Sequence, residues 1–244
     1  YFGHTGNQGE AVIWGHALGA KLADMSGYQG HGSVAHPHGA LISWALMMEG
    51  GIQINTEGER FSNEHDGYSE QAERVIRQPD QTAYALIDDR ILALGREFPD
   101  FCGAEAAGAL ISAASIAEME DRLGVPVGAL QATLDDVAVC QSGQQEDSFG
   151  RDFTTKPVLT GAIHAIRVTG ALFHTQGGLD INLDAEVIDA NGQPLGGLLA
   201  AGGAARGVSG PDVSGYLSGN GLLTAITLGR IAGRQAAVLL AGSP

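Results

Sequence analysis

The sequence predicts a mixed fold, α/β plus α+β, and three observations lead to this prediction. Short apolar segments with the length of strands alternate with longer segments whose apolar residues recur at helical spacing. Glycines gather where the apolar strands end and just before the last helix. The last third combines both features in three glycine-rich stretches, residues 174–181, 192–203 and 214–233. Glycines placed in this way let a backbone approach a flat or phosphorylated cofactor, so this third of the chain indicates a flavin.

Length and composition narrow the class of protein. A chain of 244 residues that is 44% hydrophobic can bury one large core or two small ones. The formal charge of −15, from 28 acidic and 13 basic residues, would repel a nucleic acid backbone and an anionic membrane surface. No apolar run reaches the roughly 18 residues of a membrane span. We therefore expect neither nucleic acid binding nor membrane insertion, and we expect a cytoplasmic protein because two cysteines fit a reducing compartment.

The first part of the chain predicts a helix, a strand, a second helix and a second strand. Residues 5–24 indicate a turn followed by a helix of small residues. Residues 51–55 are a predicted strand, residues 69–77 a helix, and residues 84–87 another strand. The face of the first helix that we expect to be buried carries Ala11, Trp14, Leu18 and Leu22.

The second part predicts helices first and strands later. Residues 103–122 are Ala-rich with apolar side chains at helical spacing, and residues 127–139 continue in the same manner after a break. The polar residues 141–151 indicate a loop. The predicted strands and the final helix are residues 163–168, 171–173, 179–183, 195–201 (a buried strand) and 221–240.

The start of the chain and the motif search point to a piece of a longer protein. The chain begins at Tyr1 without an initiator Met and leads directly into a glycine-punctuated turn. The dinucleotide fingerprint G-x-G-x-x-G between a strand and a helix is absent from the sequence. We therefore expect that the segment carrying this fingerprint is a missing N-terminal partner of the chain.

Seven blocks, in order, carry a resemblance to a known family. They are T-G-x-x-G, H-P-x-G, G-I-x-I-N-x-E-G-x-R-F-x-N-E, F-G-R, H-T-x-G-G-L, G-L-x-A-A-G and G-N-G-L-L-x-A-x-x-x-G-R-x-A-G. This order resembles the second half of the fumarate reductase and succinate dehydrogenase flavoproteins, a family of FAD-dependent oxidoreductases that includes the 3-ketosteroid dehydrogenases. The resemblance covers almost the whole chain and implies FAD as the cofactor.

The resemblance also implies a domain organisation. Residues 1–37 and 163–244 would form part of a Rossmann-like FAD-binding domain. Residues 38–162 would form an inserted α+β capping domain that closes over a small-molecule substrate. An electron donor or acceptor would complete the reaction.

Cofactor contacts are implied by the glycine-rich blocks. A helix that begins near Gly221 would direct its free N–H groups at the flavin, where they would stabilise negative charge by about 1 kcal/mol. The turn before the first helix carries Asn7 where the family has an acid, and Gly203 stands where the family often has Glu. The residues predicted to contact the cofactor are Thr5, Gly6, Asn7, Gly9, Gly202, Gly203, Gly219, Asn220 and Leu222. An ordinary Asx-type turn and a helix capped by Asn220 are the structural alternatives.

The positions that bind a dicarboxylate in fumarate reductases are changed here. The proton-relay positions carry Trp44 and Met47, and Tyr68 and Tyr216 fall near the places of two substrate-side arginines. Without those charged partners a dicarboxylate would lose several kcal/mol of binding and transition-state stabilisation. The resemblance to ketosteroid dehydrogenases instead implies a tyrosine that moves the proton on the carbon next to a ketone.

Histidines complete the predicted site. His174 matches a family histidine that holds a substrate oxygen, and a histidine near a tyrosine could also favour its deprotonated form; His65 is the other candidate for that role. His36 and Ser43 are predicted to contact substrate. The spacing of His31, His36 and His38 is a poor match to a zinc site, so we expect no metal.

These patterns predict a flavin-dependent dehydrogenase or reductase that acts on a CH–CH or C=C bond beside a carbonyl. Hydride would pass to or from flavin N5, and a tyrosine would handle the proton. Two alternatives stay open: a dicarboxylate enzyme of the fumarate reductase or succinate dehydrogenase type, and a non-catalytic fragment of such a flavoprotein. A serine hydrolase is disfavoured because no G-x-S-x-G motif occurs.

Overall fold

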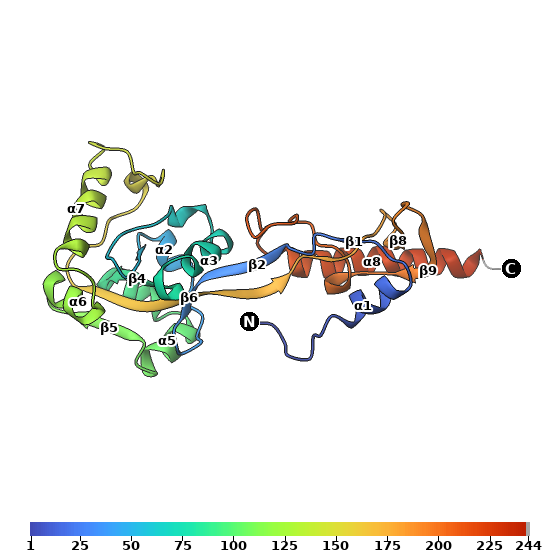
Figure 1. Ribbon diagram of the computed structural model, residues 1–244, viewed down its shortest axis with the longest axis horizontal. Helices are drawn as coiled ribbons and strands as arrows, with labels where there is room; N and C mark the ends of the chain where they lie inside the picture. Colours follow the sequence, from blue (N-terminus) through green and yellow to red (C-terminus); the bar gives the residue numbers. More distant parts are fainter. Residues whose placement is uncertain (243–244) are drawn as a thin grey trace. The chain divides into compact units, whose positions relative to one another are not determined.

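The computed structural model describes residues 1–242, and the chain divides into two compact units. Unit 1 comprises Tyr1–Gln29 and Leu172–Pro244, and unit 2 comprises Gly30–Ala171 (Figure 1). The chain passes between them twice, within strands β2 (Tyr28–Ala35) and β6 (Ile163–Thr175).

A five-stranded sheet organises unit 2. Its strand order is β2-β6-β4-β3, and β5 also pairs with β6. The pairs β3–β4, β4–β6 and β5–β6 are antiparallel. The remaining strands are β3 (Ile52–Ile54), β4 (Thr82–Asp88) and β5 (Leu110–Ala113).

Six α-helices and three short 3-10 helices surround this sheet. Polar side chains fix several of the helix starts: Asp88 accepts the Ile91 N–H at the start of α4, and Ser115 accepts the Glu118 N–H at the start of α6. The helices are α2 (Ala45–Met48), α3 (Tyr68–Ile76), α4 (Asp89–Gly95), α5 (Pro99–Ala106), α6 (Ile116–Leu123) and α7 (Ala129–Gln141). The 3-10 helices are η1 (Glu64–Asp66), η2 (Pro79–Gln81) and η3 (Phe153–Thr155).

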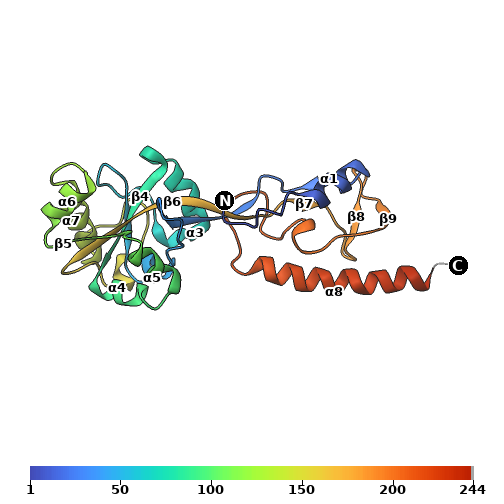
Figure 2. The same cartoon turned by 90° about the horizontal axis from the view of Figure 1, so that it is seen from below.

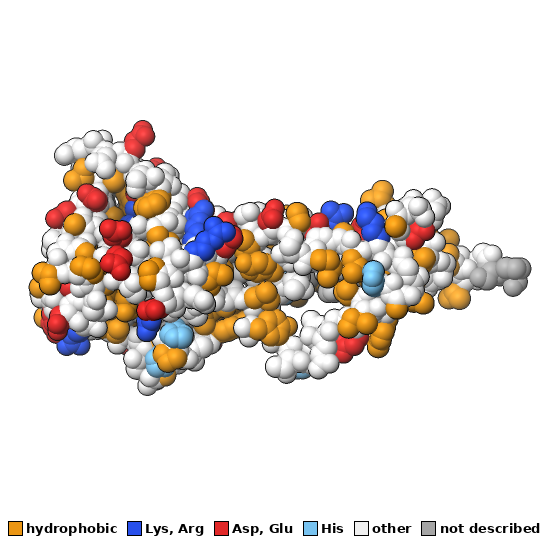
Figure 3. Space-filling view, viewed as in Figure 1, with side chains coloured by type: hydrophobic (Ala, Val, Ile, Leu, Met, Phe, Trp, Pro, Cys, Tyr) orange, Lys and Arg blue, Asp and Glu red, His pale blue; other side chains and the backbone are white. Residues whose placement is uncertain are grey.

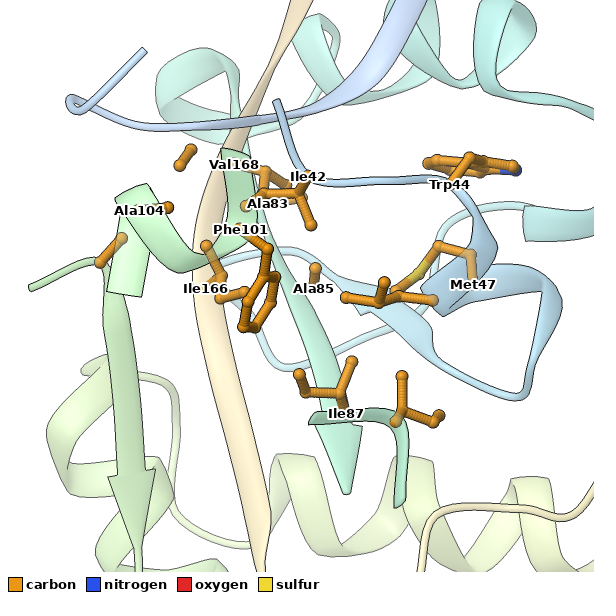
Figure 4. Close-up of a cluster of buried hydrophobic side chains, with 14 of the residues drawn as sticks. Ile42, Trp44, Met47, Ala83, Ala85, Ile87, Phe101, Ala104, Ile166 and Val168 are labelled. Carbon is orange, nitrogen blue, oxygen red and sulfur yellow. The ribbon is translucent and has the colours of Figure 1, made fainter. Parts of the chain in front are cut away.

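Both faces of the sheet are covered, so unit 2 has two apolar cores. Successive side chains of a strand point to opposite faces, and every residue of β4 is buried. Ala83, Ala85 and Ile87 pack into one core, and Tyr84 and Leu86 into the other. Figure 4 shows the first core, in which Phe101 of α5 lies beside Ile166 of β6 and near Ala85.

A buried ionic cluster, formed by Arg60, Glu64, Asp147 and Arg151, joins distant segments of unit 2. The Glu64 carboxylate accepts hydrogen bonds from Arg60 (2.8 Å), from Arg151 (3.0 Å) and from the Gln53 N–H (3.0 Å). Arg60 also contacts Asp147 at 2.5 Å. Burial raises the pKa of Glu64, but the two arginines lower it further, so the net shift is downward. The carboxylate is therefore charged and fully paired.

Unit 1 contains small sheets and a long helix. β1 (Leu22–Ala23) pairs with β7 (Gly178–Leu179), and β8 (Glu186–Ile188) pairs with β9 (Pro194–Leu199). Its helices are α1 (Glu10–Ala17), η4 (Gly202–Ala204) and α8 (Asn220–Ala241), and α8 packs on η4 and β9. Figure 2 shows α8 as one uninterrupted helix. The buried core of unit 1 is formed by Ala20, Leu179, Val187, Ala200 and Ala205.

Large apolar side chains on α1 and α8 of unit 1 are exposed. In α1 and at its end, Trp14 is 67% and Leu18 66% exposed; in α8, Leu222 is 76% and Ile226 73% exposed. Apolar side chains also reach the surface in the space-filling view of Figure 3. No helix within residues 1–242 combines the length and apolar character needed to cross a membrane.

Several predicted elements agree with the structure. The helices predicted at 69–77, 127–139 and 221–240 correspond to α3, α7 and α8, and the strands predicted at 51–55 and 84–87 correspond to β3 and β4. The polar residues 141–151 lie outside helices and strands except at Gln141.

Other predictions were wrong. The helix predicted over residues 103–122 is interrupted by β5, whose Leu110, Ile111 and Ala113 pack in the sheet. The predicted strands 163–168 and 171–173 are one strand, β6, because Gly170 continues the extended backbone close to the Ala72 carbonyl. Of residues 179–183, Leu179 belongs to strand β7. Strand β9 is not buried, and the expected apolar face of α1 is exposed at Trp14.

Candidate functional site

The predicted site residues divide between the two units. His36, Ser43 and Tyr68 belong to unit 2. The others lie in unit 1: Thr5, Gly6, Asn7, Gly9, His174, Gly202, Gly203, Tyr216, Gly219, Asn220 and Leu222. Each unit therefore carries its own set, and we describe them in turn.

The turn before α1 is exposed and uses glycine at its end. The Asn7 N–H donates to the His4 carbonyl at 3.0 Å. Gly9 caps α1 with φ 81°, a left-handed conformation that glycine adopts without strain. The side chains of Thr5 and Asn7 are exposed, and nothing in this turn packs into the core.

A cavity of about 490 Å³ opens beside this turn. Its lining includes Asn7 and Gly9 from the turn, Thr175 at the end of β6, Gly177 just after it, and Gly203 from η4. None of the described residues that line it has an acidic or basic side chain; the others are Tyr1, Gln8, Val12, Ile13, Met25 and Leu172. Three glycine-containing blocks that are far apart in sequence thus meet at one cavity.

Gly203 is an open part of this cavity wall. A side chain at Gly203 would meet no atom within 4 Å, and its φ is not in the left-handed region. Neither packing nor backbone conformation within the chain therefore explains the glycine. Open space lies in front of Gly203, and a bare backbone of this kind can lie against a planar ring.

A second, small cavity of about 40 Å³ also has Gly203 in its lining. It lies between the end of β6 with the residues that follow it, η4 and the start of α8. Its walls are His174, Thr175, Gln176, Gly202, Gly203, Ala205, Gly207, Asn220, Gly221 and Thr224, again without a carboxylate, lysine or arginine.

The structure brings His174 and Tyr216 together. The two rings meet edge to face at 5.6 Å, and the Tyr216 hydroxyl lies 3.2 Å from His174 Nε2. His174 Nδ1 lies 3.0 Å from the Thr175 carbonyl. Because a carbonyl only accepts, Nδ1 carries the proton and Nε2 is free to accept from Tyr216. The imidazole is therefore set as a hydrogen-bond acceptor for the phenol.

Gln176 links this pair to the start of α8. Its amide nitrogen lies 3.3 Å from His174 Nδ1 and 3.4 Å from His174 Nε2, and its amide oxygen accepts from Asn220 at 3.1 Å. Asn220 also donates to the Ser209 hydroxyl. Helix α8 begins at Asn220, so Asn220 is not its cap. The cap is Gly219, with φ 79°, and no side chain makes a capping hydrogen bond.

The first turn of α8 can place positive potential at the small cavity. A helix of 22 residues leaves its first N–H groups without partners in the helix, and Gly221 and Thr224 of this turn line the cavity. Leu222 points away into the exposed apolar surface, 76% accessible. Its predicted contact with a cofactor stays a prediction.

In unit 2, Tyr68 begins α3 and stacks on a buried histidine. The rings of Tyr68 and His31 are 5.1 Å apart with an interplanar angle of 22°. Trp44 also contacts His31: the two ring centroids are 5.8 Å apart, and the rings meet edge to face. Burial lowers the pKa of His31 to about 4, so the ring is neutral near pH 7. His65 is directed elsewhere, 3.3 Å from the Met47 carbonyl.

Of the other predicted residues of unit 2, His36 lies in a surface turn and Ser43 is half-buried just before α2. His36 is exposed, precedes a cis proline, and its N–H donates to the Arg167 carbonyl at 2.8 Å. The Ser43 hydroxyl accepts the Ala45 N–H at 3.3 Å near the start of α2. Among residues 1–242 no group of three His, Cys, Asp or Glu side chains could hold a metal ion.

Sequence reasoning missed three residues of this arrangement as site members. Gln176 was visible in the block H-T-Q-G-G but had no assigned role, and its bridge to Asn220 joins residues 44 positions apart. His31 and Trp44 meet because the Ile42 N–H donates to the Ser33 carbonyl at 2.9 Å, which places residues 31 and 44 opposite each other. That pairing has no signal in either segment alone.

Comparison with known proteins identifies relatives along nearly the whole chain. A family described as FAD binding domain matches residues 2–222. The NADH:fumarate oxidoreductase of Klebsiella pneumoniae is 32% identical over 235 residues, which is 96% of this chain and 25% of that protein.

Two solved structures share the fold. The open conformation of a flavocytochrome c3 fumarate reductase is 26% identical with a TM-score of 0.69, covering 95% of this chain and 40% of that one. The 3-ketosteroid-delta4-(5alpha)-dehydrogenase of Rhodococcus jostii, in complex with 4-androstene-3,17-dione, is 27% identical with a TM-score of 0.67, covering 94% and 45%. The predicted fold class is confirmed, and the chain spans less than half the length of these relatives.

Proposed function

The chain belongs to the FAD binding domain family, and from this premise we propose that it is part of an enzyme that oxidises or reduces a carbon–carbon bond beside a carbonyl. Unit 1 would hold part of the FAD, and unit 2 would be the capping domain over the substrate. FAD, the cofactor of this family, takes up or supplies a hydride when it is bound. The residues of this chain would bind and orient the substrate and move the proton.

The contact between Tyr216 and His174 carries the proposal. The Tyr216 hydroxyl donates to His174 Nε2 at 3.2 Å, in the block where related enzymes place an anion-binding arginine. A phenol ordinarily loses its proton near pH 10. His174 Nε2 would take the phenol proton, and the tyrosinate left on Tyr216 would then take a proton from the carbon next to a ketone; in the reverse direction both protons return by the same route.

The charge of unit 1 supports a ketone rather than a dicarboxylate. The described linings of both cavities lack lysine and arginine. Lys21 is paired with Asp180 at 2.7 Å, and Arg206 with Asp24 at 2.6 Å. A substrate with two carboxylates would find no free guanidinium in this wall, whereas a carbonyl oxygen needs only hydrogen-bond donors such as Tyr216 or a backbone N–H.

The glycine-rich wall supports the flavin assignment. Gly203, Gly177 and Gly9 expose backbone to the larger cavity, and the first turn of α8 faces the smaller one. We propose Thr5, Gly6, Asn7, Gly9, Gly202, Gly203, Gly219, Asn220 and Leu222 as the cofactor-contacting residues of the chain.

A further segment of FAD-binding domain is the proposed partner of unit 1. The exposed side chains of Trp14, Leu18, Leu222 and Ile226 give unit 1 apolar surface that its five-residue core does not use. The relatives are longer than this chain by more than a factor of two. A further segment that covers these helices would complete the FAD-binding domain. Without that segment the chain would be a non-catalytic fragment.

The experiment compares two substrate classes in a longer protein that contains this chain and binds FAD. We expect dehydrogenation of a cyclic ketone with a dye as electron acceptor, and a loss of about 10²-fold or more in kcat for Tyr216→Phe. Tyr84→Phe is the matched control, because Tyr84 bonds to the Leu123 carbonyl in the core of unit 2 and should leave kcat unchanged. Absorbance near about 450 nm reports bound flavin.

A dicarboxylate enzyme remains the second candidate, because the relative from Klebsiella pneumoniae is named for fumarate. Turnover of fumarate with a reduced dye, unaffected by Tyr216→Phe, would support it and refute the role of Tyr216. Absence of flavin colour in the longer protein would refute both.

A further inference from the structure

Three side chains of unit 2 form a line that the proposed flavin chemistry does not use. The Ser112 hydroxyl lies 2.7 Å from His164 Nδ1, and His164 Nε2 lies 2.9 Å from the Asp89 carboxylate. Ser112 is on β5, His164 on β6 and Asp89 at the first position of α4. A hydroxyl, an imidazole and a carboxylate in hydrogen-bonded series are the parts of a nucleophilic serine site, which is recognised by geometry rather than by sequence order.

The strand register explains why these side chains meet. β5 and β4 lie on opposite sides of β6, since β4 already pairs along residues 163–169 of β6. The Arg167 carbonyl accepts from the His36 N–H on the β2 side of β6. Backbone groups of a strand alternate in direction, so those of residues 163 and 165 point to the same side as those of Arg167, toward β5, and those of His164 point away from β5. Ser112 and His164 are therefore a non-hydrogen-bonded pair, in which facing Cα atoms are only about 4.5 Å apart.

The tautomer of His164 follows from its partners. A carboxylate at neutral pH only accepts, so His164 Nε2 carries the proton and donates it to Asp89. Nδ1 then accepts from the Ser112 hydroxyl. Asp89 accepts this hydrogen bond at 2.9 Å and so fixes the orientation of the imidazole toward Ser112.

Access and oxyanion stabilisation come from the sheet edge. His164 is buried at 7% exposure, whereas Ser112 is exposed. Because Ser112 is in a non-hydrogen-bonded pair with β6, its own N–H points outward from β5, and no strand among residues 1–242 pairs with that edge. A backbone N–H next to the nucleophile is the kind of donor that stabilises the oxyanion in acyl transfer.

We propose that Ser112, His164 and Asp89 form a second, flavin-independent site that accepts acyl groups from small activated esters. The Ser112 oxygen bonds to the acyl carbon while the bond to the leaving alcohol or phenol breaks, and the serine proton passes through His164 to the leaving oxygen. Water then attacks the acyl-serine, the carboxylic acid leaves, and Ser112 regains its proton. The site lies on an open edge, so small acyl groups are the expected substrates.

The test treats the 244-residue chain with 4-nitrophenyl acetate and locates the acetyl group by peptide mass spectrometry. We expect acetyl-Ser112 and release of nitrophenolate, lost in Ser112→Ala and slowed about 10²-fold or more in His164→Gln. Asp89→Asn, a change at an exposed side chain that spares the sheet, should slow acylation by a smaller factor. Ser142→Ala is the control, because Ser142 is an exposed serine whose hydroxyl donates to the Val139 carbonyl at 2.7 Å.

Two outcomes would overturn the proposal. Acetylation of Ser112 at an equal rate in the wild type, His164→Gln and Asp89→Asn would show that the three side chains serve only to hold β5 on the sheet. Acetylation confined to lysines, tyrosines or Ser142 in a folded chain, checked by circular dichroism, would show that Ser112 is not a nucleophile. Neither outcome bears on the flavin function, which is tested through Tyr216.

Discussion

Unit 1 and unit 2 differ in how much of their apolar surface they bury themselves. Unit 2 covers both faces of its sheet, and side chains such as Ile87 and Phe101 are almost completely inaccessible. Unit 1 places five residues in its core and leaves Trp14 and Ile226 exposed. Unit 2 therefore has the contacts of a self-sufficient domain, whereas unit 1 leaves apolar helix surface that we propose a further segment covers.

Removing one member of the buried ionic cluster is the strongest test of the self-sufficiency of unit 2. Arg151→Ala leaves Glu64 with one arginine and removes the cation above the Phe153 ring at 4.6 Å. We expect the free energy of unfolding of unit 2 to fall by about 3–5 kcal/mol. In a Trp14→Phe background, Trp44 fluorescence during urea unfolding reports unit 2 alone. An unchanged midpoint would refute the role of the cluster. The exposed pair Arg122–Glu118 supplies the control, since Arg122→Ala should leave the midpoint unchanged.

The same substitution in both units measures their difference directly. Ile87→Ala empties a fully buried position and should cost about 2–5 kcal/mol. Ile226→Ala, at 73% exposure, should change the stability of this chain by less than about 0.5 kcal/mol. In a longer protein that covers α8, Ile226→Ala should become destabilising. Equal costs for Ile226→Ala with and without the added segment would mean that nothing packs on α8.

Acid should weaken unit 2 through His31. The pKa of His31 is lowered to about 4 by burial, whereas an unfolded chain binds the proton at its ordinary value of about 6.5. As pH falls from about 6.5 to 4, His31 binds a proton in the unfolded state but not in the folded state. The free energy of unfolding should therefore fall by on the order of 3 kcal/mol. Urea midpoints at several pH values should decline less steeply in His31→Phe, and identical slopes would contradict the assignment.

A glycine in unit 1 should matter for binding and not for folding. Gly203→Ala places a methyl group where no atom lies within 4 Å, so the unfolding free energy should stay within about 0.5 kcal/mol. In the longer protein the methyl group would occupy the wall of the cofactor cavity and weaken FAD binding, measured by flavin fluorescence. Gly103→Ala in α5 of unit 2 is the matched control, expected to leave FAD affinity unchanged. Equal affinity in both variants would remove Gly203 from the site.

Local patterns predicted the helices and strands whose faces are consistently buried or exposed. Helix α3 was foreseen as a segment that Pro79 ends, and β4 as a strand that follows it. The Ala-rich segment around β5 was wrongly predicted as helix, because alanine favours helices. Its contact with β6 joins residues more than fifty positions apart, such as Ser112 and His164, and has no local signal. In the site, the motifs named Tyr216 and His174 separately. Their contact spans 42 positions and required the fold.

The buried ionic cluster imposes a rule on how this chain can vary. Its two arginines and two carboxylates sum to zero charge, so the loss of any one of the four leaves the cluster with a net charge. Losing Glu64 alone leaves one cation in excess, because Arg60 keeps Asp147 as a partner, and losing Arg151 alone leaves one anion in excess. Substitutions at these positions should therefore be tolerated in compensating pairs, such as Glu64→Gln with Arg151→Met, rather than singly. This epistasis would leave a record of coupled changes at positions that lie 87 residues apart in the chain.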